Sequence, residues 1–386
     1  MKFPRHKLLI RDVLYDLGNN FNIEQDLDII YTSMSFSLPY VDKGSWSTAN
    51  IRKYDVVKLY YKEFDSLRDA EVADINNMSV EFFGYVDQLS LSEDKGTGLK
   101  YQIQCKSLAG LLFEKTTVVP IAQQDLIGLM EEAQRLLGPT LLPSYEVAGF
   151  SRIFIPKLDS KNFFGEMLNE LKEKYAIQVF QRGNGTLVVT TPAYFNTQQN
   201  ITVYDLTKNI FASDYGNITQ NIDSVLVLGT NAVGFAVDPI AMQLKLGVLP
   251  ENIDVNFLPT REQCNPLILE RRDVFDSETA QSIARNKLIE SARNYNVTID
   301  VPYKEGQNVG DILTIINSKV ISPTQKWIIK KRSVIISKTD IKTKLILYSN
   351  SISDFPDDIL RDSTGILDTD ILNITEKVED VFLIPQ

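Results

Sequence analysis

Residues able to carry nucleophilic, acid–base or metal chemistry are few and widely spaced in this chain. The one histidine, His6, lies in a basic N-terminal segment, and the two cysteines, Cys105 and Cys264, are far apart. A zinc site, a redox pair or a Cys/His dyad needs such residues at short, regular spacing. Cys105 alternates with polar neighbours, which favours a small buried hydrophobe. The sequence therefore predicts no catalytic residue, no metal site and no cofactor, and His6 in solvent.

Three other sequence patterns contain residue types that can form sites. The run Glu270-Arg271-Arg272-Asp273 is typical of an ion-pair network. The turn Gly183-Asn184-Gly185 lacks the Lys-Ser/Thr and the helix start of a phosphate loop, so it predicts a hairpin turn. A pair of carboxylates suited to glycoside hydrolysis stays open, because their separation is a three-dimensional quantity.

Composition bounds the class of protein. The 386 residues are 44% hydrophobic and 10% aromatic, which predicts a folded protein of about two to four domains. Neither a secretory signal nor an apolar run of membrane-spanning length is evident, so we expect a protein made in a cytoplasm without stable membrane binding. The net charge of −10 argues against a protein whose main task is to grip phosphate backbones.

The elements that would position any site begin with a hairpin over Val80 to Phe113. Tyr101, Ile103 and Cys105 alternate with polar residues after a Gly-rich turn, and a helical turn follows at Ser107. Residues 28–38 and 54–62 supply further strands, and residues 62–77 are expected to form a loop. Residues 1–115 are therefore predicted to be an all-β domain.

The middle of the chain changes period. A helix capped by Asp125 and stopped at Gly138-Pro139, a second helix ending at Tyr175 and a hairpin predict an α+β domain over residues 116–200. Residues 201–350 return to β structure and form the expected second β-domain. It contains a strand at 221–229, a long excursion at 231–266, a helix at 277–294, and a final hairpin much like the first.

Residues 351–386 form an acidic C-terminal extension. It holds nine acidic and two basic residues, so most of the net charge lies there. Paired hydrophobic residues interrupt the polar sequence, and such a segment can order on a partner; a flexible tail is the alternative. The candidate partner-binding residues are Ile359, Leu360, Ile366, Leu367, Ile371 and Leu372.

Three motifs, in this order, resemble one family. They are Phe82-Phe-Gly84-Tyr-Val86-Asp87 leading to Ser107-Leu-Ala-Gly-Leu-Leu112; the helix Phe163 to Tyr175 followed by the hairpin at Asn184 to Val189; and the helix Ala280 to Tyr295 followed by Val309-Gly310-Asp311 and Lys326-Trp327. Together they span roughly residues 30 to 350. The family is that of baseplate hub proteins of phage tails, which includes late control protein D and the hub part of type VI secretion spikes.

The resemblance implies a structural virion protein with two tube-like antiparallel β-barrels per chain, residues 1–115 and 201–350, and the α+β domain between them. It implies a homotrimer whose six barrels match a sixfold tail tube while the trimer accepts a threefold spike or tail-tip protein. Other implied partners are a distal tail protein and wedge or fibre proteins, with DNA only passing through the lumen. Two alternatives remain: a tail-associated glycan-binding or glycan-cleaving protein, and a distal-tail or fibre-attachment subunit.

Overall fold

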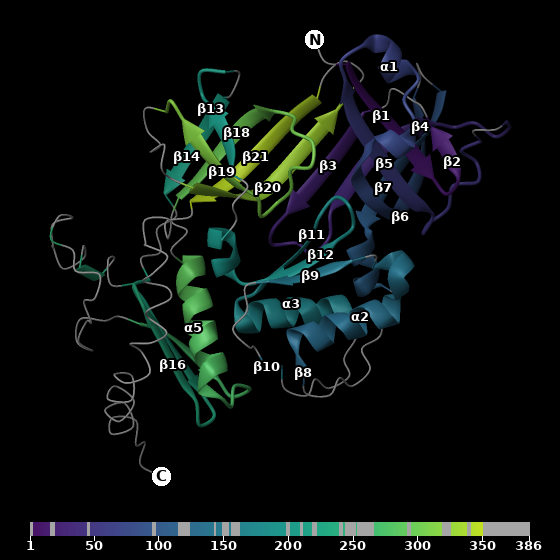
Figure 1. Ribbon diagram of the computed structural model, residues 1–386. Coiled ribbons are helices and arrows are strands. Elements are labelled where there is room, and N and C mark those ends of the chain that lie inside the picture. The colour runs from purple at the N-terminus through teal and green to yellow at the C-terminus, as the bar shows by residue number, and fades with distance from the viewer. Residues whose placement is uncertain are drawn as a thin grey trace.

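The computed structural model describes most of the chain up to Ser349. The described residues are 3–15, 20–44, 47–94, 98–114, 124–142, 144–148, 154–155, 163–197, 201–208, 211–217, 222–238, 242–243, 252, 266–291, 295–318, 326–337 and 341–349. Within these ranges the protein is mainly β, as predicted. One large sheet forms the upper part in Figure 1, and a layer of helices and small sheets lies below it.

The first half of the large sheet, which we call lobe 1, is built by residues 3–107. Its strands run in the order β3-β4-β7-β6-β5-β1-β2, and all of these pairings are antiparallel. One face is apolar: Met34, Phe36 and Leu38 point into the core, as the alternation of this strand predicted. The strands are β1 (Phe3–Ile10), β2 (Val13–Tyr15), β3 (Phe21–Asp26), β4 (Ser33–Pro39), β5 (Val56–Phe64), β6 (Ser79–Asp94) and β7 (Gly98–Ser107).

The segment after β5 differs from the expected loop. It folds into the short helix α1 (Leu67–Glu71) and the 3-10 turn η1 (Ile75–Asn77). Ser66 accepts a hydrogen bond from Asp69 N at 3.1 Å and so caps α1. The helical turn predicted after β7 is present as η2 (Leu108–Phe113).

The second half of the sheet, lobe 2, repeats the plan of lobe 1. Its order is β14-β18-β21-β20-β19-β13, in which every pairing is antiparallel except β13 with β19. Both long hairpins have a register shift at the same place, between Val86 and Gln88 in β6 and between Ile329 and Lys331 in β20. The strands are β13 (Thr202–Asp205), β14 (Phe211–Asn217), β18 (Tyr295–Pro302), β19 (Ile312–Ile316), β20 (Lys326–Ile336) and β21 (Ile341–Ser349).

The two lobes form one continuous sheet, because β20 also pairs antiparallel with β3. Within the described residues the strand pairings of neither lobe close into a ring. The expected pair of barrels is therefore not confirmed, whereas the mainly β architecture is.

The helical layer starts with α2 (Leu126–Leu141) and α3 (Phe164–Tyr175). Asp125 caps α2, as predicted, by accepting a hydrogen bond from Gly128 N at 2.9 Å, and Gly138 interrupts the helix with φ 74°. The predicted hairpin forms as β11 (Gln178–Gln181) and β12 (Leu187–Thr190). A parallel partner of β12, β9 (Tyr145–Ala148), was not predicted. The remaining short elements are β8 (Gln124–Asp125), β10 (Phe154–Ile155) and η3 (Pro192–Thr197).

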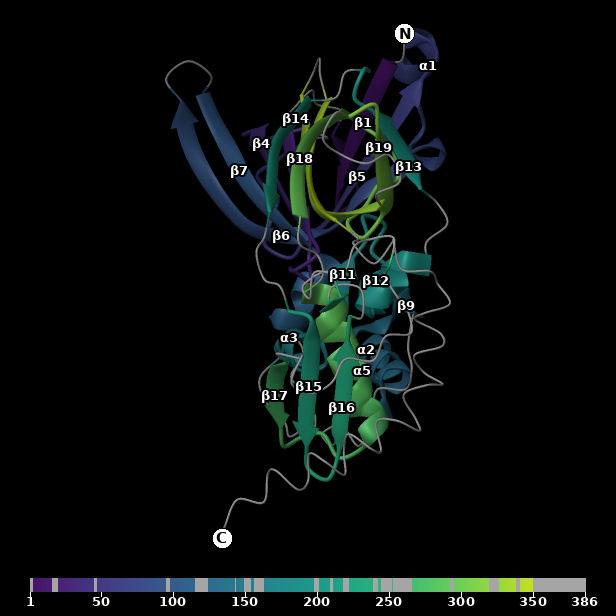
Figure 2. The ribbon, with the colours of Figure 1, turned by 90° about the vertical axis from the view of Figure 1, so that its left-hand side faces the viewer.

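The strand predicted at residues 221–229 is present, but it does not join the large sheet. It is β15 (Ser224–Gly229), which pairs with β16 (Val233–Val237) and β17 (Leu267–Arg271) in a separate sheet. Helix α5 (Ser277–Ser291) packs on this sheet, which lies below lobe 2 in Figure 2. β16 lies within the segment expected to be an unpatterned excursion.

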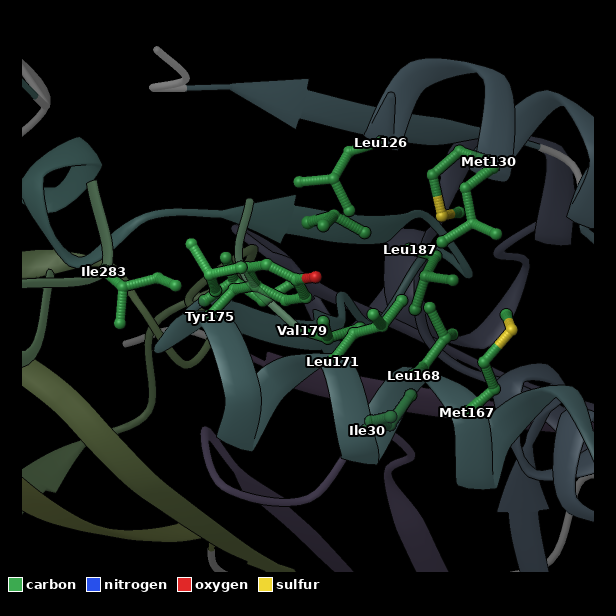
Figure 3. Packing of buried hydrophobic residues seen from close by; sticks show 14 of the residues in the cluster. Ile30, Leu126, Met130, Met167, Leu168, Leu171, Tyr175, Val179, Leu187 and Ile283 are labelled. Carbon is green, nitrogen blue, oxygen red and sulfur yellow. The ribbon is translucent and has the colours of Figure 1, made fainter. Parts of the chain in front are cut away.

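A single core joins α2, α3, the β11–β12 hairpin and the α5 unit. Leu168, Leu171 and Tyr175 of α3 point toward Val179 and Leu187 in Figure 3, and Ile283 of α5 belongs to the same cluster. Ile30, next to β4, also contributes to it. The helical layer is thus fixed to lobe 1 by apolar packing. The exact domain boundaries stay predictions.

Candidate functional site

The junction of the two lobes is the best-defined polar site in the described residues. The outer half of β20 pairs with β3 from Lys331 opposite Asp26 to Ile336 opposite Phe21. Val334 and Ile336 are 0% exposed and belong to the core of lobe 1. A strand of lobe 2 therefore completes the core of lobe 1.

A buried ion pair crosses this junction. Arg332 Nη2 of β20 lies 3.0 Å from Glu81 Oε2 of β6, and the two side chains are 1% and 4% exposed. Arg332 Nη1 also donates to Gln25 Oε1 of β3 at 3.4 Å. Charges can be buried at this depth only when they are paired and hydrogen-bonded. The pair therefore holds β20, β6 and β3 in one arrangement.

A bulge in β6 turns the Glu81 side chain toward Arg332. β6 and β5 are out of step between Leu59, which faces Phe82, and Tyr60, which faces Val80, so Glu81 has no opposite residue. A bulge of this kind redirects a side chain. The alternation of polar and apolar residues along β6 did not predict that Glu81 is buried. Arg332 had a readable signal, because it lies two residues before Val334 on the core face of its strand.

Two tyrosines complete the apolar and polar surroundings of the ion pair. Tyr303 donates its hydroxyl hydrogen to Glu81 Oε1, and its ring lies 4.4 Å from that of Tyr61, centroid to centroid. Burial raises the pKa of Tyr303, and the charge of Glu81 raises it further. Burial likewise raises the pKa of Tyr61, with Glu63 as the next cause. Both hydroxyls thus stay protonated donors.

Asn308 ties the helical layer to the same network. Its Oδ1 accepts hydrogen bonds from Gly183 N at 2.9 Å and from Gln25 Nε2 at 3.3 Å. Its own backbone N–H donates to Asp311 Oδ2 at 2.7 Å. Burial raises the pKa of Asp311, against the opposing effect of that hydrogen bond. The Gly183 turn is thus the predicted hairpin turn, and it makes a structural contact between units.

The face of the sheet opposite the core is polar. Asn22, Ser35, Gln104 and Gln88 lie opposite one another in turn on β3, β4, β7 and β6. A depression of about 440 Å³ opens on this face, and Lys331 and Lys106 are among its lining residues. Its uncharged amides and hydroxyls, with charges of both signs, offer no concentrated positive field for a phosphate backbone.

A salt-bridge network borders this depression. Lys106 Nζ lies 3.1 Å from Asp87 Oδ2 and 3.2 Å from Glu114 Oε1, and Lys53 Nζ lies 3.5 and 3.6 Å from the same two side chains. Burial alone would raise the pKa of Glu114, but hydrogen bonds from Lys106 and Tyr54 hold that pKa below its usual value. The two lysines and two carboxylates balance in charge, and their ion pairs connect β6, β7 and the end of η2.

The sequence-based site predictions have mixed outcomes. The six candidate partner-binding residues, Ile359 to Leu372, lie outside the described residues. Cys105 is buried, as predicted, and burial raises the pKa of its thiol. Arg271 Nε pairs with Asp273 Oδ1 at 3.2 Å, which confirms the ion-pair interpretation. His6 is partly buried and packs 5.1 Å from the ring of Phe21, so its expected position in solvent is wrong.

The described residues contain no candidate metal site and no candidate membrane-spanning helix. No group of three or more His, Cys, Asp or Glu side chains in these ranges is arranged to hold a metal ion. No helix in the described part of the chain is both long and apolar enough to cross a membrane.

Comparison with solved structures places this fold among tail proteins. The chain is similar to a 43 kDa tail protein of prophage MuSo2 from Shewanella oneidensis, with a TM-score of 0.63, 11% identity, and coverage of 90% of this chain and 99% of the other. It is similar to a tail protein from Neisseria meningitidis, with a TM-score of 0.60, 13% identity and coverage of 89% and 96%.

A type VI secretion component from E. coli matches with a TM-score of 0.51, 8% identity and coverage of 89% and 76%, and it is described as similar to tail proteins gp27 and gp5 of phage T4. No protein-family model and no curated protein matches the chain. The fold is thus that of phage tail and type VI spike-related proteins, the structural group which the sequence motifs resemble.

Proposed function

We propose that this protein is a structural component of a phage tail: a baseplate hub whose three copies form a ring between a sixfold tail tube and a threefold spike or tail tip. The observation that carries the proposal is the repeat within the chain. The six strands of lobe 2 follow the order of β3, β4, β7, β6, β5 and β1 in lobe 1, with only the last pairing reversed in direction, and the long hairpins of both lobes have the same register shift. Three chains therefore present six similar lobes.

The helical layer supports the threefold part of the proposal. It lies on one side of the large sheet in Figure 1, and its two parts are unlike each other. One part holds α2, α3 and the β11–β12 hairpin, and the other holds α5 on a three-stranded sheet. A ring of three chains would thus be nearly sixfold at its lobes and only threefold at its helical side. That asymmetry is what a symmetry adapter requires.

The proposed lumen is lined by the polar sheet face. A surface of amides, hydroxyls and mixed charges suits a channel through which DNA passes without adhesion. In this proposal the lobes act as the two tube-like barrels of each chain, and the virion tail is the location. The tube or distal tail protein contacts the lobes, and the spike or tip protein contacts the helical side.

The first test is the mass of the purified protein by light scattering at several concentrations, with negative-stain electron microscopy of the same samples. We expect a particle of three times 43.7 kDa and a ring with six similar outer lobes. A protein that stays monomeric at every concentration, and also when it is mixed with its tail tube and spike partners, would contradict the hub proposal.

The acidic extension, residues 351–386, is proposed to bind a neighbouring spike, wedge or fibre protein. Its support is the pattern of paired hydrophobic residues between acidic ones. After deletion of residues 351–386 the protein should still have the mass of a trimer, but it should no longer bind the neighbouring protein in pull-down assays. A second variant separates hydrophobicity from charge: replacement of Ile359, Leu360, Ile366 and Leu367 by Ser keeps the charge of the extension and should also abolish binding. Unchanged tail assembly after deletion would contradict this role.

A further inference from the structure

The two long hairpins occupy equivalent positions in their lobes but different environments. The tip of the β20–β21 hairpin lies against lobe 1, where Val334 is 0% exposed. The tip of the β6–β7 hairpin extends away from the rest of the sheet in Figure 2, and Leu91 and Leu99 are 51% and 42% exposed. Counted from the shared register shift, Leu91 is the equivalent of Val334. One hairpin is covered by a neighbouring lobe, whereas within the described part of the chain no lobe covers the other.

Two strand edges are open in the same way. In the described residues β6 pairs with β5 only up to Tyr85, so its outer half, Gln88–Asp94, is paired on the β7 side alone. Among the described strands β14 ends the sheet, and its one pairing partner there is β18. An open edge of this kind is a template for another strand.

The repeat shows how these two edges match. In the strand order of the lobes, β6 corresponds to β20 and β14 corresponds to β3. Within the chain, the half of β20 beyond its register shift pairs with β3 and joins the two lobes. The corresponding strands, β6 and β14, are far apart in the sheet of one chain, because β18, β21, β20, β3, β4 and β7 lie between them. They could pair within one chain only if the sheet closed into a ring.

We propose that β6 of one copy pairs antiparallel with β14 of the next copy, so that the contact between chains repeats the contact between lobes. The proposal rests on the hub function and specifies its interface. The register follows from the junction, in which Ile335 lies opposite Asn22 and Val334 opposite Ile23. Transferred to the equivalent positions, it places Ser92 opposite Asp214 and Leu91 opposite Tyr215.

A second copy of this chain is the occupant that the observations favour. The pairing is heterologous, since each copy offers a hairpin at one end and an edge strand at the other, and such contacts close into a ring when the rotation allows it. It also covers Leu91 and Leu99, whose burial on association is favourable by the hydrophobic effect. A strand from an unrelated partner could pair with the open edge of β14. It would not explain why the same chain also has a complementary open edge on β6.

The test is disulfide crosslinking across the expected pair. In a Cys264→Ser background, Ser92→Cys and Asp214→Cys are combined in one chain and oxidised, and products are separated on a non-reducing gel. Opposite residues of an antiparallel pair have Cα atoms about 4.5 to 5.5 Å apart, which is within disulfide range. We expect covalent dimers and trimers from the combination and none from either single variant.

Two control pairs calibrate the experiment. Asn22→Cys with Ile335→Cys reproduces the same position at the internal junction, so it should form an intramolecular bond that changes mobility without raising mass. Gln88→Cys with Asp214→Cys is out of register by four residues, about 13 Å along a strand, and should crosslink poorly.

The outcomes separate this inference from the hub proposal. A trimer in solution with efficient Ser92–Asp214 crosslinking supports both. A trimer that crosslinks only out of register, or not at all while the internal control pair does, overturns the β6–β14 interface and leaves the ring. Crosslinking into open-ended polymers supports the strand pairing and overturns the closed ring. A monomer without crosslinks at any concentration overturns both.

A second variant tests the apolar part of the contact. Leu91→Asp places a charge where the neighbouring copy should cover the side chain. Because Leu91 is exposed in the single chain, the substitution should not affect the folding of the monomer. Ile127→Asp on α2 is the matched control, since Ile127 is 52% exposed. We expect loss of the trimer for Leu91→Asp alone, with unchanged thermal unfolding of the monomer. Equal trimer content in both variants would overturn the contact.

Discussion

At the scale of single residues, the contact between the lobes depends on charge burial. Arg332 and Glu81 are almost fully buried and come from strands of different lobes. The attraction between them offsets the cost of removing both from water only while both are present.

We expect Arg332→Met to lower the free energy of unfolding by about 3 to 5 kcal/mol, because it leaves the Glu81 carboxylate buried without its cation. The double variant Arg332→Met with Glu81→Leu should lose less than the single variant. Urea denaturation measures both. Lys331→Met is the adjacent control: its 3.7 Å pair with Glu24 is open to solvent, with side chains 37% and 45% exposed, so its loss should cost less than about 1 kcal/mol. A double variant less stable than Arg332→Met would contradict this account.

Asp205 provides a pH-dependent contact between β13 and the end of β19. Its carboxylate accepts hydrogen bonds from Asn317 Nδ2 at 2.8 Å and from Thr207 Oγ1 at 2.7 Å, and these lower its pKa to about 2. A carboxyl pKa below its unfolded value of 3.8 stabilises the folded state above that pH. That stabilisation is lost as the pH falls from about 4 toward 2.

Asp205→Asn should therefore unfold with a weaker pH dependence than the unchanged protein between about pH 4 and pH 2. Thermal unfolding midpoints measured at steps across this range provide the test. Because the Asp205 side chain is partly exposed to solvent, the difference should also shrink at high salt. Parallel midpoints for both proteins over the whole range would show that these hydrogen bonds do not favour the charged form.

At the scale of elements, helix boundaries with a capping residue were the most predictable features. Asp125 caps α2 with its side chain exposed, so Asp125→Ala should lower the free energy of unfolding by about 1 kcal/mol. Asp125→Ser retains an oxygen acceptor and should lose only a fraction of that. Chemical denaturation of the two variants side by side decides the point. Equal losses would mean that the capping hydrogen bond is not the source of the effect.

The sequence also predicted the elements with a strong period. The buried face of α3 and the alternation of β4 were read directly, because both have one apolar side. β9 was missed because its four residues are all partly buried and show no alternation. β15 was predicted as a strand of the second β-domain, but its pairing with β16 and β17 was not: a short apolar run shows that a strand is buried but not which partner buries it.

Glu81 shows why the site itself was not predicted. Its burial depends on a bulge in β6 and on Arg332, which lies 251 residues further along the chain. Neither the bulge nor the pairing of β20 with β3 has a local signature in the sequence. What the sequence did supply was the recurrence of a β unit, and the structure shows that recurrence as a shared strand order.

At the scale of the whole molecule, the proposed lumen should not retain duplex DNA. The polar face carries charges of both signs, and the chain has a net charge of −10. We expect no gel retardation of a short duplex at physiological salt. Asp300 lies on the same face as Glu24, because Asp300 is opposite Lys344, Lys344 is opposite Ser333 and Ser333 is opposite Glu24. Glu24→Lys with Asp300→Lys makes this face positive and should cause binding that weakens steeply as salt rises. Glu71→Lys with Glu278→Lys, on α1 and α5, changes the net charge equally and should bind less. Retardation by the unchanged protein would argue against a face that lets DNA pass without adhesion.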